Sequence, residues 1–362
     1  MNPFRWLTAL ALALCAVVVV FGAYVRLSDA GLGCPDWPGC YGRLAVPTEP
    51  ASVESAQQQY PDRPLVQAKA SKEMIHRYLA STLGLLILAL GALSFRAGHP
   101  KVLPRVLVAL VAFQGLLGMW TVTWLLKPLV VTAHLFGGLA TLALLCWLFL
   151  EALRARPAPD MGATAAGYLG QLAAREGAYR NEREAFGGLQ AVASAGPRQP
   201  AGLRLAAGAG LVLLAGQVFL GGWTSSNYAA LACPDLPTCQ GRWWPELDAK
   251  EAFTLGRGLG VNYEHGVLDN RARVTIHWLH RVGALTVSLF LAVLGSWLWR
   301  CGGARKRYGV AICALLTAQV AIGASMVWLQ LPLALAVAHN AGAALLLLTL
   351  VSLNHFAWRQ PA

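Results

Sequence analysis

The chain has 362 residues, of which 56% are hydrophobic and 13% are charged, and its formal net charge is +12. A soluble domain carries about 25% charged residues, so this composition argues against a soluble enzyme. The positive charge does not indicate nucleic-acid binding, because many of the basic residues stand in short connections between long apolar segments. We therefore expect a polytopic protein of the lipid bilayer.

Eight apolar stretches are long enough to cross a membrane as helices. In chain order they cover residues 5–27, 75–95, 103–123, 129–151, 203–225, 274–299, 306–328 and 332–356. The first could be mistaken for a signal peptide, but it lacks a small-residue cleavage site and has a counterpart later in the chain. The predicted fold class is therefore all-α, with eight transmembrane helices.

Basic residues in short connections mark the cytoplasmic side of a membrane protein. They concentrate after the second and the sixth predicted helices, at Arg96, Lys101, Arg105, Arg300, Arg305, Lys306 and Arg307. The connections after the third and the seventh predicted helices carry only Lys127. We expect both termini in the cytoplasm of a bacterial-type cell, with the protein in its inner membrane and the long loops outside.

The chain carries one cysteine motif twice. CPDWPGC covers residues 34–40 and CPDLPTC covers residues 233–239, and both continue to a Gly-Arg pair. Other landmarks recur in the same order at a nearly constant offset, namely Gly22 with Gly221, His76-Arg77 with His280-Arg281, Gln114-x3-Gly118 with Gln319-x3-Gly323, and Ala133-His134 with Ala338-His339. Such self-similarity indicates internal duplication. We interpret the chain as two tandem pseudo-symmetric four-helix bundles, 1–151 and 203–362, joined by a cytoplasmic linker, 152–202.

The repeated cysteines can form disulfides or bind a metal. No further cysteine or paired histidine stands near either motif to complete four metal ligands. The prolines favour turns that bring the two sulfurs together, and an external loop lies in an oxidising compartment. We therefore favour two disulfides within the loops, Cys34–Cys40 and Cys233–Cys239.

Four histidines are placed alike in the two halves. His76 and His280 lie near the external starts of the second and sixth predicted helices, and His134 and His339 near those of the fourth and eighth. Ionisable residues in membrane helices are rare and usually functional. A single such histidine is more simply an interhelical hydrogen-bonding residue, but four at matched depth favour haem ligation, one iron between two imidazoles in each half.

The neighbours of these histidines suit a haem. Gly137-Gly138 and Gly342 follow the histidines of the fourth and eighth predicted helices, and we expect them to leave space for a flat macrocycle. Arg77 and Arg281 directly follow the other two histidines and could pair with propionates.

The two halves differ at the position three residues before each histidine that is directly followed by an arginine. Glu73 precedes His76, whereas His277 precedes His280, each on the same helix face as the following histidine. One interpretation is a division of labour, in which Glu73 serves catalysis in the first half and the second half holds a permanent haem. The alternative is that Glu73 is an ordinary acidic residue in the first turn of a helix.

Together these motifs resemble the haem A synthase family. The resemblance rests on E-x-x-H-R at 73–77, G-x-x-x-R at 22–26 followed by CPDWPxC, A-H-x-x-G at 133–137 and 338–342, and H-R at 280–281. It covers both halves and excludes the linker. It implies an eight-helix enzyme that oxidises the C8 methyl of haem O to a formyl group, giving haem A for terminal oxidases. Haem O synthase and assembly factors of the terminal oxidase are then the implied partners.

The resemblance also implies roles for individual residues. His280 and His339 would hold a haem b cofactor, His76 and His134 would receive haem O, and Glu73 would be needed for activity. His277 is a second candidate ligand one turn from His280, and we choose His280 because it aligns with His76. Two rivals from other classes are a di-haem b electron carrier linked to quinone and a membrane thiol–disulfide relay, which would leave the four histidines without a purpose.

Overall fold

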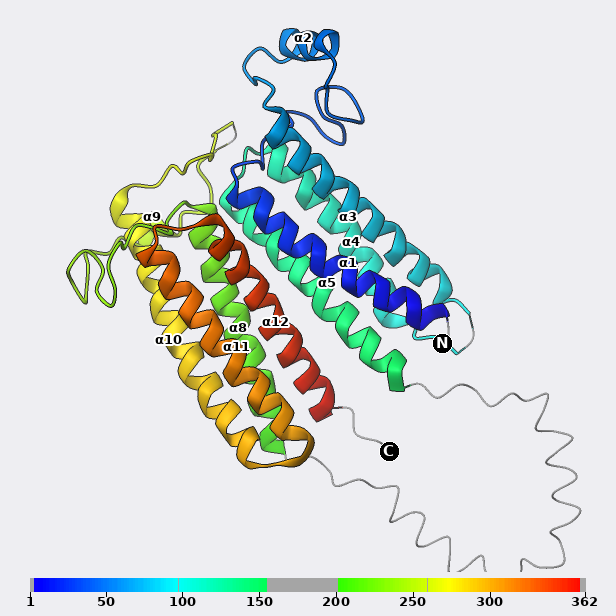
Figure 1. The fold of residues 1–362 in the computed structure, drawn as a ribbon, viewed down its shortest axis with the longest axis vertical. Coiled ribbons are helices and arrows are strands. Elements are labelled where there is room, and N and C mark those ends of the chain that lie inside the picture. Colours follow the sequence, from blue (N-terminus) through cyan, green and yellow to red (C-terminus); the bar gives the residue numbers. More distant parts are fainter. Residues whose placement is uncertain (1–2, 97, 155–200, 259, 359–362) are drawn as a thin grey trace, which may run out of the picture.

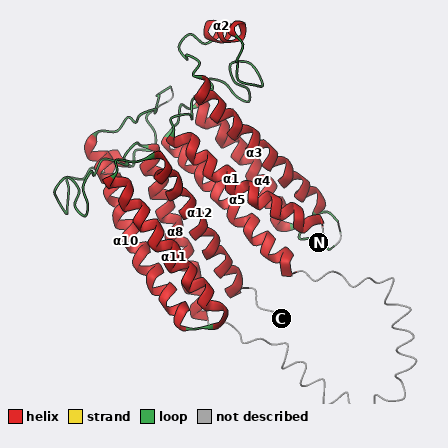
Figure 2. Ribbon diagram, in the orientation of Figure 1, coloured by secondary structure: helices red, strands yellow, loops and turns green. Residues whose placement is uncertain are grey.

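The computed structural model describes residues 3–96, 98–154, 201–258 and 260–358. In these residues the regular secondary structure is helical, and Figure 2 shows helices and loops without a strand. Eight of the described helices are long and apolar enough to cross a membrane. The predicted all-α class and the predicted number of spans are therefore confirmed.

The spans form two groups of four that follow each other in the chain. The first group is α1 (Pro3–Leu27), α3 (Gln67–Leu93), α4 (Val102–Thr123) and α5 (Pro128–Arg154). The second group is α8 (Ala201–Ser226), α10 (Asn270–Arg300), α11 (Gly303–Trp328) and α12 (Leu333–Trp358). Two short helices, α2 (Pro50–Gln59) and α9 (Ala249–Ala252), interrupt the long loops. Most of the predicted linker, from 155 to 200, lies outside the described residues.

Within each group the helices pack in a closed ring. In the first ring α1 and α4 each contact both α3 and α5, and in the second α8 and α11 occupy the corresponding places between α10 and α12. The groups meet where α5 contacts α8 and α12 and where α1 contacts α12. Figure 1 shows the two groups side by side. The division of the chain at 151 and 203 and the pseudo-symmetry of the halves both stay predictions.

Apolar residues cover the helices on all sides. The core of the first ring includes the buried side chains of Ile87, Leu90 and Leu107, and the core of the second includes Leu291 and Leu298. Large apolar side chains are also exposed on the outside of the helices, among them Leu85, Val212, Leu289 and Val293. A helix that is apolar all round suits a membrane, because lipid covers its outer face.

Both long loops lie at one end of the helices, and the described chain begins and ends at the other (Figure 1). We call the first end the loop end. Two spans start nearer to it than predicted, α3 at Gln67 and α10 at Asn270. Hydropathy locates only the apolar part of a helix, whereas Asp269 caps α10 by accepting a hydrogen bond from the Ala272 amide.

A contact between the groups at the loop end depends on Arg26. Its guanidinium donates to the Tyr228 hydroxyl at 3.0 Å and to the Ser225 carbonyl at 3.0 Å. The guanidinium carbon also lies 4.3 Å from the centre of the Tyr228 ring. This side chain therefore ties the last turn of α1 to the end of α8.

We predict that Arg26→Met lowers the thermal unfolding midpoint in detergent by about 2–4 °C, since hydrogen bonds from a charged donor are lost. Tyr228→Phe keeps the ring and should lower it less. Arg43→Met, at an exposed arginine of the first loop, is the matched control and should leave the midpoint unchanged. Equal midpoints for Arg26→Met and the control would contradict the assignment.

Candidate functional site

The two cysteine loops have the disulfides predicted from the sequence. Cys34 bonds to Cys40 and Cys233 bonds to Cys239, with Cα–Cα distances of 4.8 and 4.6 Å. No group of three or more potential metal ligands occurs among the described residues. The metal alternative for the cysteines therefore finds no support.

The aspartate and glycine of each motif shape its loop. The Asp36 carboxylate accepts hydrogen bonds from the amides of Tyr41 at 2.6 Å and Gly42 at 2.9 Å. These two residues have φ angles of 54° and 72°, in the left-handed region, where glycine is least strained. The motif thus encodes a turn that its own aspartate stabilises.

The second loop repeats this arrangement. Asp235 accepts from the amides of Gln240 and Gly241 and from the Thr238 hydroxyl. The hydroxyl bond, followed by the amide bonds, lowers the pKa of Asp235 to about 2. The carboxylate therefore stays ionised, and its hydrogen bonds persist, at any pH above that range.

An arginine joins each loop to a spanning helix. Arg77 of α3 donates to the carbonyls of Asp36 at 3.0 Å and Pro38 at 3.2 Å, and also to that of Gly39. In the second half Arg281 of α10 donates to the carbonyls of Cys233, Asp235 and Thr238 at 2.6, 2.7 and 2.8 Å. The arginines thus clamp the loops, a role that the sequence did not suggest. Their predicted pairing with propionates stays a prediction.

Glu73 and His277 occupy equivalent places beneath the loops. The Glu73 carboxylate accepts from the Cys34 amide at 2.9 Å and pairs with Arg77 at 2.5 Å. Likewise, His277 Nδ1 lies 3.2 Å from the Cys233 amide, and its Nε2 lies 3.3 Å from Arg281 Nε. Both residues are 5% exposed. Each one connects the start of a disulfide to the arginine that clamps its loop.

Two open questions from the sequence are answered by these contacts. Glu73 is not a first-turn residue, because α3 begins at Gln67 and its fully described first turn holds no acidic residue. That alternative is wrong, since the polar turn before the apolar run is also helical. His277 has both ring nitrogens occupied by loop contacts. His280 is thus the better candidate for a ligand on α10.

Each of the four repeated histidines packs against a glycine of a neighbouring helix. A Cβ atom at Gly22 of α1 would lie 2.8 Å from His76 Cε1, and one at Gly118 of α4 would lie 3.4 Å from His134 Cε1. The other half repeats this, with 3.2 Å from Gly221 to His280 and 3.1 Å from Gly323 to His339. In the sequence these glycines were only landmarks of the repeat. In the structure they let an imidazole lie against the adjacent helix.

The expected role of Gly137 and Gly342 is wrong. A Cβ atom at Gly137 would lie 2.5 Å from the Gln114 amide nitrogen, and one at Gly342 would lie 2.2 Å from the Gln319 amide oxygen. Both glycines therefore make room for a glutamine of the neighbouring helix and not for a macrocycle. Gly138 has only ordinary contacts, with Gln114 and Val19.

The two histidine rings of each half suit a metal ion whose other ligands come from a bound group and not from the protein. His76 interacts electrostatically with His134, and His280 with His339. The Nδ1 atoms of His76, His134 and His339 are fully buried without a partner, whereas no Nε2 atom of the four rings is among such buried atoms. Nε2 is therefore the ring nitrogen that is not fully buried. Two imidazoles do not complete a metal site alone, but a porphyrin supplies the remaining nitrogens.

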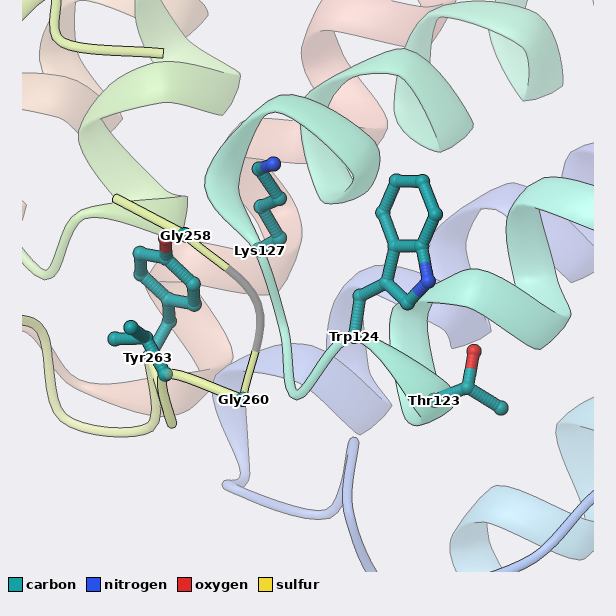
Figure 3. Close-up of a pocket in the computed structure, with 7 residues that line it drawn as sticks. Thr123, Trp124, Lys127, Gly258, Gly260 and Tyr263 are labelled. Atoms are coloured by element: carbon teal, nitrogen blue, oxygen red, sulfur yellow. The ribbon is translucent and has the colours of Figure 1, made fainter. Parts of the chain in front are cut away.

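Two small cavities lie at the boundary between the groups. One, of about 110 Å³, lies between the α4–α5 turn and the second long loop; Figure 3 shows Trp124, Lys127 and Tyr263 around it. The other, of about 150 Å³, is lined by α5 and by Phe219 of α8. Neither is lined by any of the four histidines, so the candidate site rests on the rings and their surroundings.

The fold and these contacts define an integral membrane protein with a pair of histidines in each helix group, below a disulfide-closed loop. The chain belongs to the COX15-CtaA family of cytochrome oxidase assembly proteins, whose family model matches residues 5–351.

Relatives over nearly the full length carry one name. The chain is 43% identical to the "Heme A synthase" of Shewanella oneidensis, covering 98% of this chain and 97% of the relative. It is 27% identical to the "Heme A synthase" of Caulobacter vibrioides, covering 98% and 94%. The resemblance expected from the motifs is confirmed, and neither the electron carrier nor the thiol–disulfide relay is favoured.

We predict that Arg281→Gln makes the Cys233–Cys239 disulfide easier to reduce. Losing hydrogen bonds from a charged donor at about 1.5–3 kcal/mol should raise the reduction rate by about tenfold or more. Timed treatment with dithiothreitol, trapping and peptide mass mapping would measure it. The Cys34–Cys40 disulfide of the same molecule is the internal control and should keep its rate. Equal acceleration of both disulfides, or of neither, would contradict a local clamp.

Proposed function

We propose that this protein is a haem A synthase, an oxidoreductase that converts the C8 methyl of haem O to a formyl group. The observation that carries the proposal is the duplicated histidine pair, with each ring against a glycine and its Nε2 accessible. Membership of the COX15-CtaA family and the name shared by the full-length relatives support it. Haem O synthase would supply the substrate, and assembly factors of a terminal oxidase would receive the product.

In this proposal the two halves hold different haems. His280 and His339 would hold a haem b cofactor in the second half, and His76 and His134 would receive haem O in the first. The haem b supplies electron-transfer chemistry when bound. The imidazole rings of the four histidines would be positioned by the glycine contacts described above.

The proposal places Glu73 in the chemistry of the first half. It lies one turn from His76, and it is a buried carboxylate where the other half has His277. Written with water as the oxygen source, the methyl-to-formyl conversion releases four electrons and four protons. The electrons would pass to an external acceptor, and a carboxylate can accept a proton at Oε1 or Oε2. Arg77 holds this carboxylate in place through the ion pair. Arg77 and Arg281 remain our candidates for contact with the propionates.

The proposed setting is the inner membrane of a bacterial cell. The distribution of basic residues supports a cytoplasmic location for both termini and for the 152–202 segment. The disulfide loops then face the external compartment, where disulfides persist.

We expect cells that make haem O to yield haem A when they also express this protein, as measured by chromatography and mass analysis of extracted haem. His280→Ala should lose haem b, because one axial ligand is gone, whereas His76→Ala should keep haem b and make no haem A. Haem b in both sites of the parent protein, with no formyl product, would overturn the proposal in favour of an electron carrier.

Glu73→His separates catalysis from loop support, because it copies the residue of the second half. We expect the Cys34–Cys40 disulfide to keep its reduction rate, since an imidazole makes the equivalent loop contact at Cys233. Haem A formation should fall by about 10²- to 10⁴-fold, as for the loss of a general base. His277→Glu is the reciprocal control and should affect turnover little. Haem A at the parent rate in Glu73→His would leave Glu73 with only its structural role.

A further inference from the structure

Three of the four repeated histidines receive a hydrogen bond from a glutamine on a neighbouring helix. In each case the glutamine Nε2 donates to the backbone carbonyl of the histidine. The pairs are Gln114 with His134 at 3.0 Å, Gln217 with His280 at 3.0 Å, and Gln319 with His339 at 2.9 Å. The same side chain–backbone bond thus recurs on α5, α10 and α12.

A glycine three residues after each of these histidines completes the arrangement. A Cβ atom at this glycine would lie 2.5 Å or less from the glutamine amide, at Gly137 with Gln114, Gly283 with Gln217 and Gly342 with Gln319. Any other residue would displace the glutamine. We call each set of a glutamine, its histidine and the glycine a glutamine clamp.

The clamp is missing at His76. The repeat offset that aligns Gly22 with Gly221 places Val18 opposite Gln217, and the offset that aligns His76 with His280 places Leu79 opposite Gly283. Valine cannot donate a hydrogen bond, and leucine fills the place of the glycine. No described side chain donates to the His76 carbonyl, and His76 Nδ1 is buried without a partner. At His76, therefore, neither the glutamine nor the glycine of a clamp is present.

The clamp on His280 also reaches the ring. Gln217 Nε2 lies 3.1 Å from His280 Nδ1. Contacts to the second nitrogen of a ligating histidine fix its orientation and affect how well it binds metal. The clamped backbone is fixed as well, since each clamp joins the helix of the histidine to its neighbour. His280 is therefore held by its clamp at both backbone and ring, whereas His76 has neither clamp contact.

We propose that the glutamine clamps decide which haem is retained and which is exchanged. His280 and His339 are both clamped and form a site that retains its haem. In the first half only His134 is clamped, so the unclamped His76 would be the ligand that dissociates from the iron when substrate enters or product leaves. The inference deepens the proposed function, because it takes the assignment of the two sites from it.

Exchanging the clamp between the halves tests this inference. Val18→Gln/Leu79→Gly builds a clamp at His76, and Gln217→Val/Gly283→Leu removes the one at His280. The protein is purified, saturated with haem b as the probe for both sites, and mixed with excess apomyoglobin, which traps released haem. The change in Soret absorbance gives the release rates. We expect two phases from the parent, a fast one from the first half and a slow one from the second.

The expected changes are specific to each site. The added clamp should slow the fast phase, and the removed clamp should accelerate the slow phase, each by about 5- to 30-fold for one or two hydrogen bonds. The other phase should keep its rate in each variant. Leu79→Gly alone is the matched control: it loosens the helix without adding a donor, so it should not slow the fast phase.

Failure of the inference is distinguishable from failure of the proposed function. If the parent makes haem A but neither phase changes in the variants, the clamps do not govern retention. If the phases change as expected but the parent makes no haem A, the role of the clamps in haem retention is supported and the proposed synthase function is contradicted. If a double variant fails to fold, the single variant Gln217→Val is used, because valine is smaller than glutamine and causes no clash. An unchanged slow phase in this variant would overturn the inference.

Discussion

The close approach of a glycine to each histidine ring is the constraint on which the rest of the site depends. Gly22, Gly118, Gly221 and Gly323 each lie where a Cβ atom would come within 3.4 Å of an imidazole carbon. A side chain at Gly22 would displace the ring of His76, and one at Gly221 or Gly323 would require a small shift of its histidine ring, whereas one at Gly118 would make ordinary contact. The two helices of each such pair can therefore pack closely while Nδ1 is buried and Nε2 remains accessible. In our proposal, an imidazole held between helices in this way is pre-organised to bind iron.

The disulfide loops are coupled to these rings through the same helices. Arg77 and Glu73 tie the first loop to α3, within one turn of His76, and Arg281 and His277 tie the second loop to α10 in the same way. A change in a loop therefore reaches the helix that carries a candidate ligand. The two halves use one scaffold with a carboxylate in the first and an imidazole in the second, which is the chemical difference expected if only one of them performs oxidation.

Much of this could be predicted from the sequence, and the remainder depended on contacts between helices. Hydropathy gave the eight spans, and the spacing of Cys34 and Cys40 gave the disulfide, because both signals are local. The start of α3 was missed because its first turns are polar, so Glu73 was wrongly considered for the first turn. Gly137 was expected to face a macrocycle, but it faces Gln114 of another helix, which no local pattern reveals. The repeat itself pointed to Gln114 and Gly118 without showing that they contact the same histidine, His134.

The central claim is that each half places one iron between two histidines. An experimental structure of the protein purified with haem b and haem O, at a resolution that resolves the macrocycles, tests it most directly. The account predicts one haem with its iron between Nε2 of His280 and Nε2 of His339, and a second between Nε2 of His76 and Nε2 of His134. Iron ligated by His277, or a haem bound away from these four rings, would contradict it.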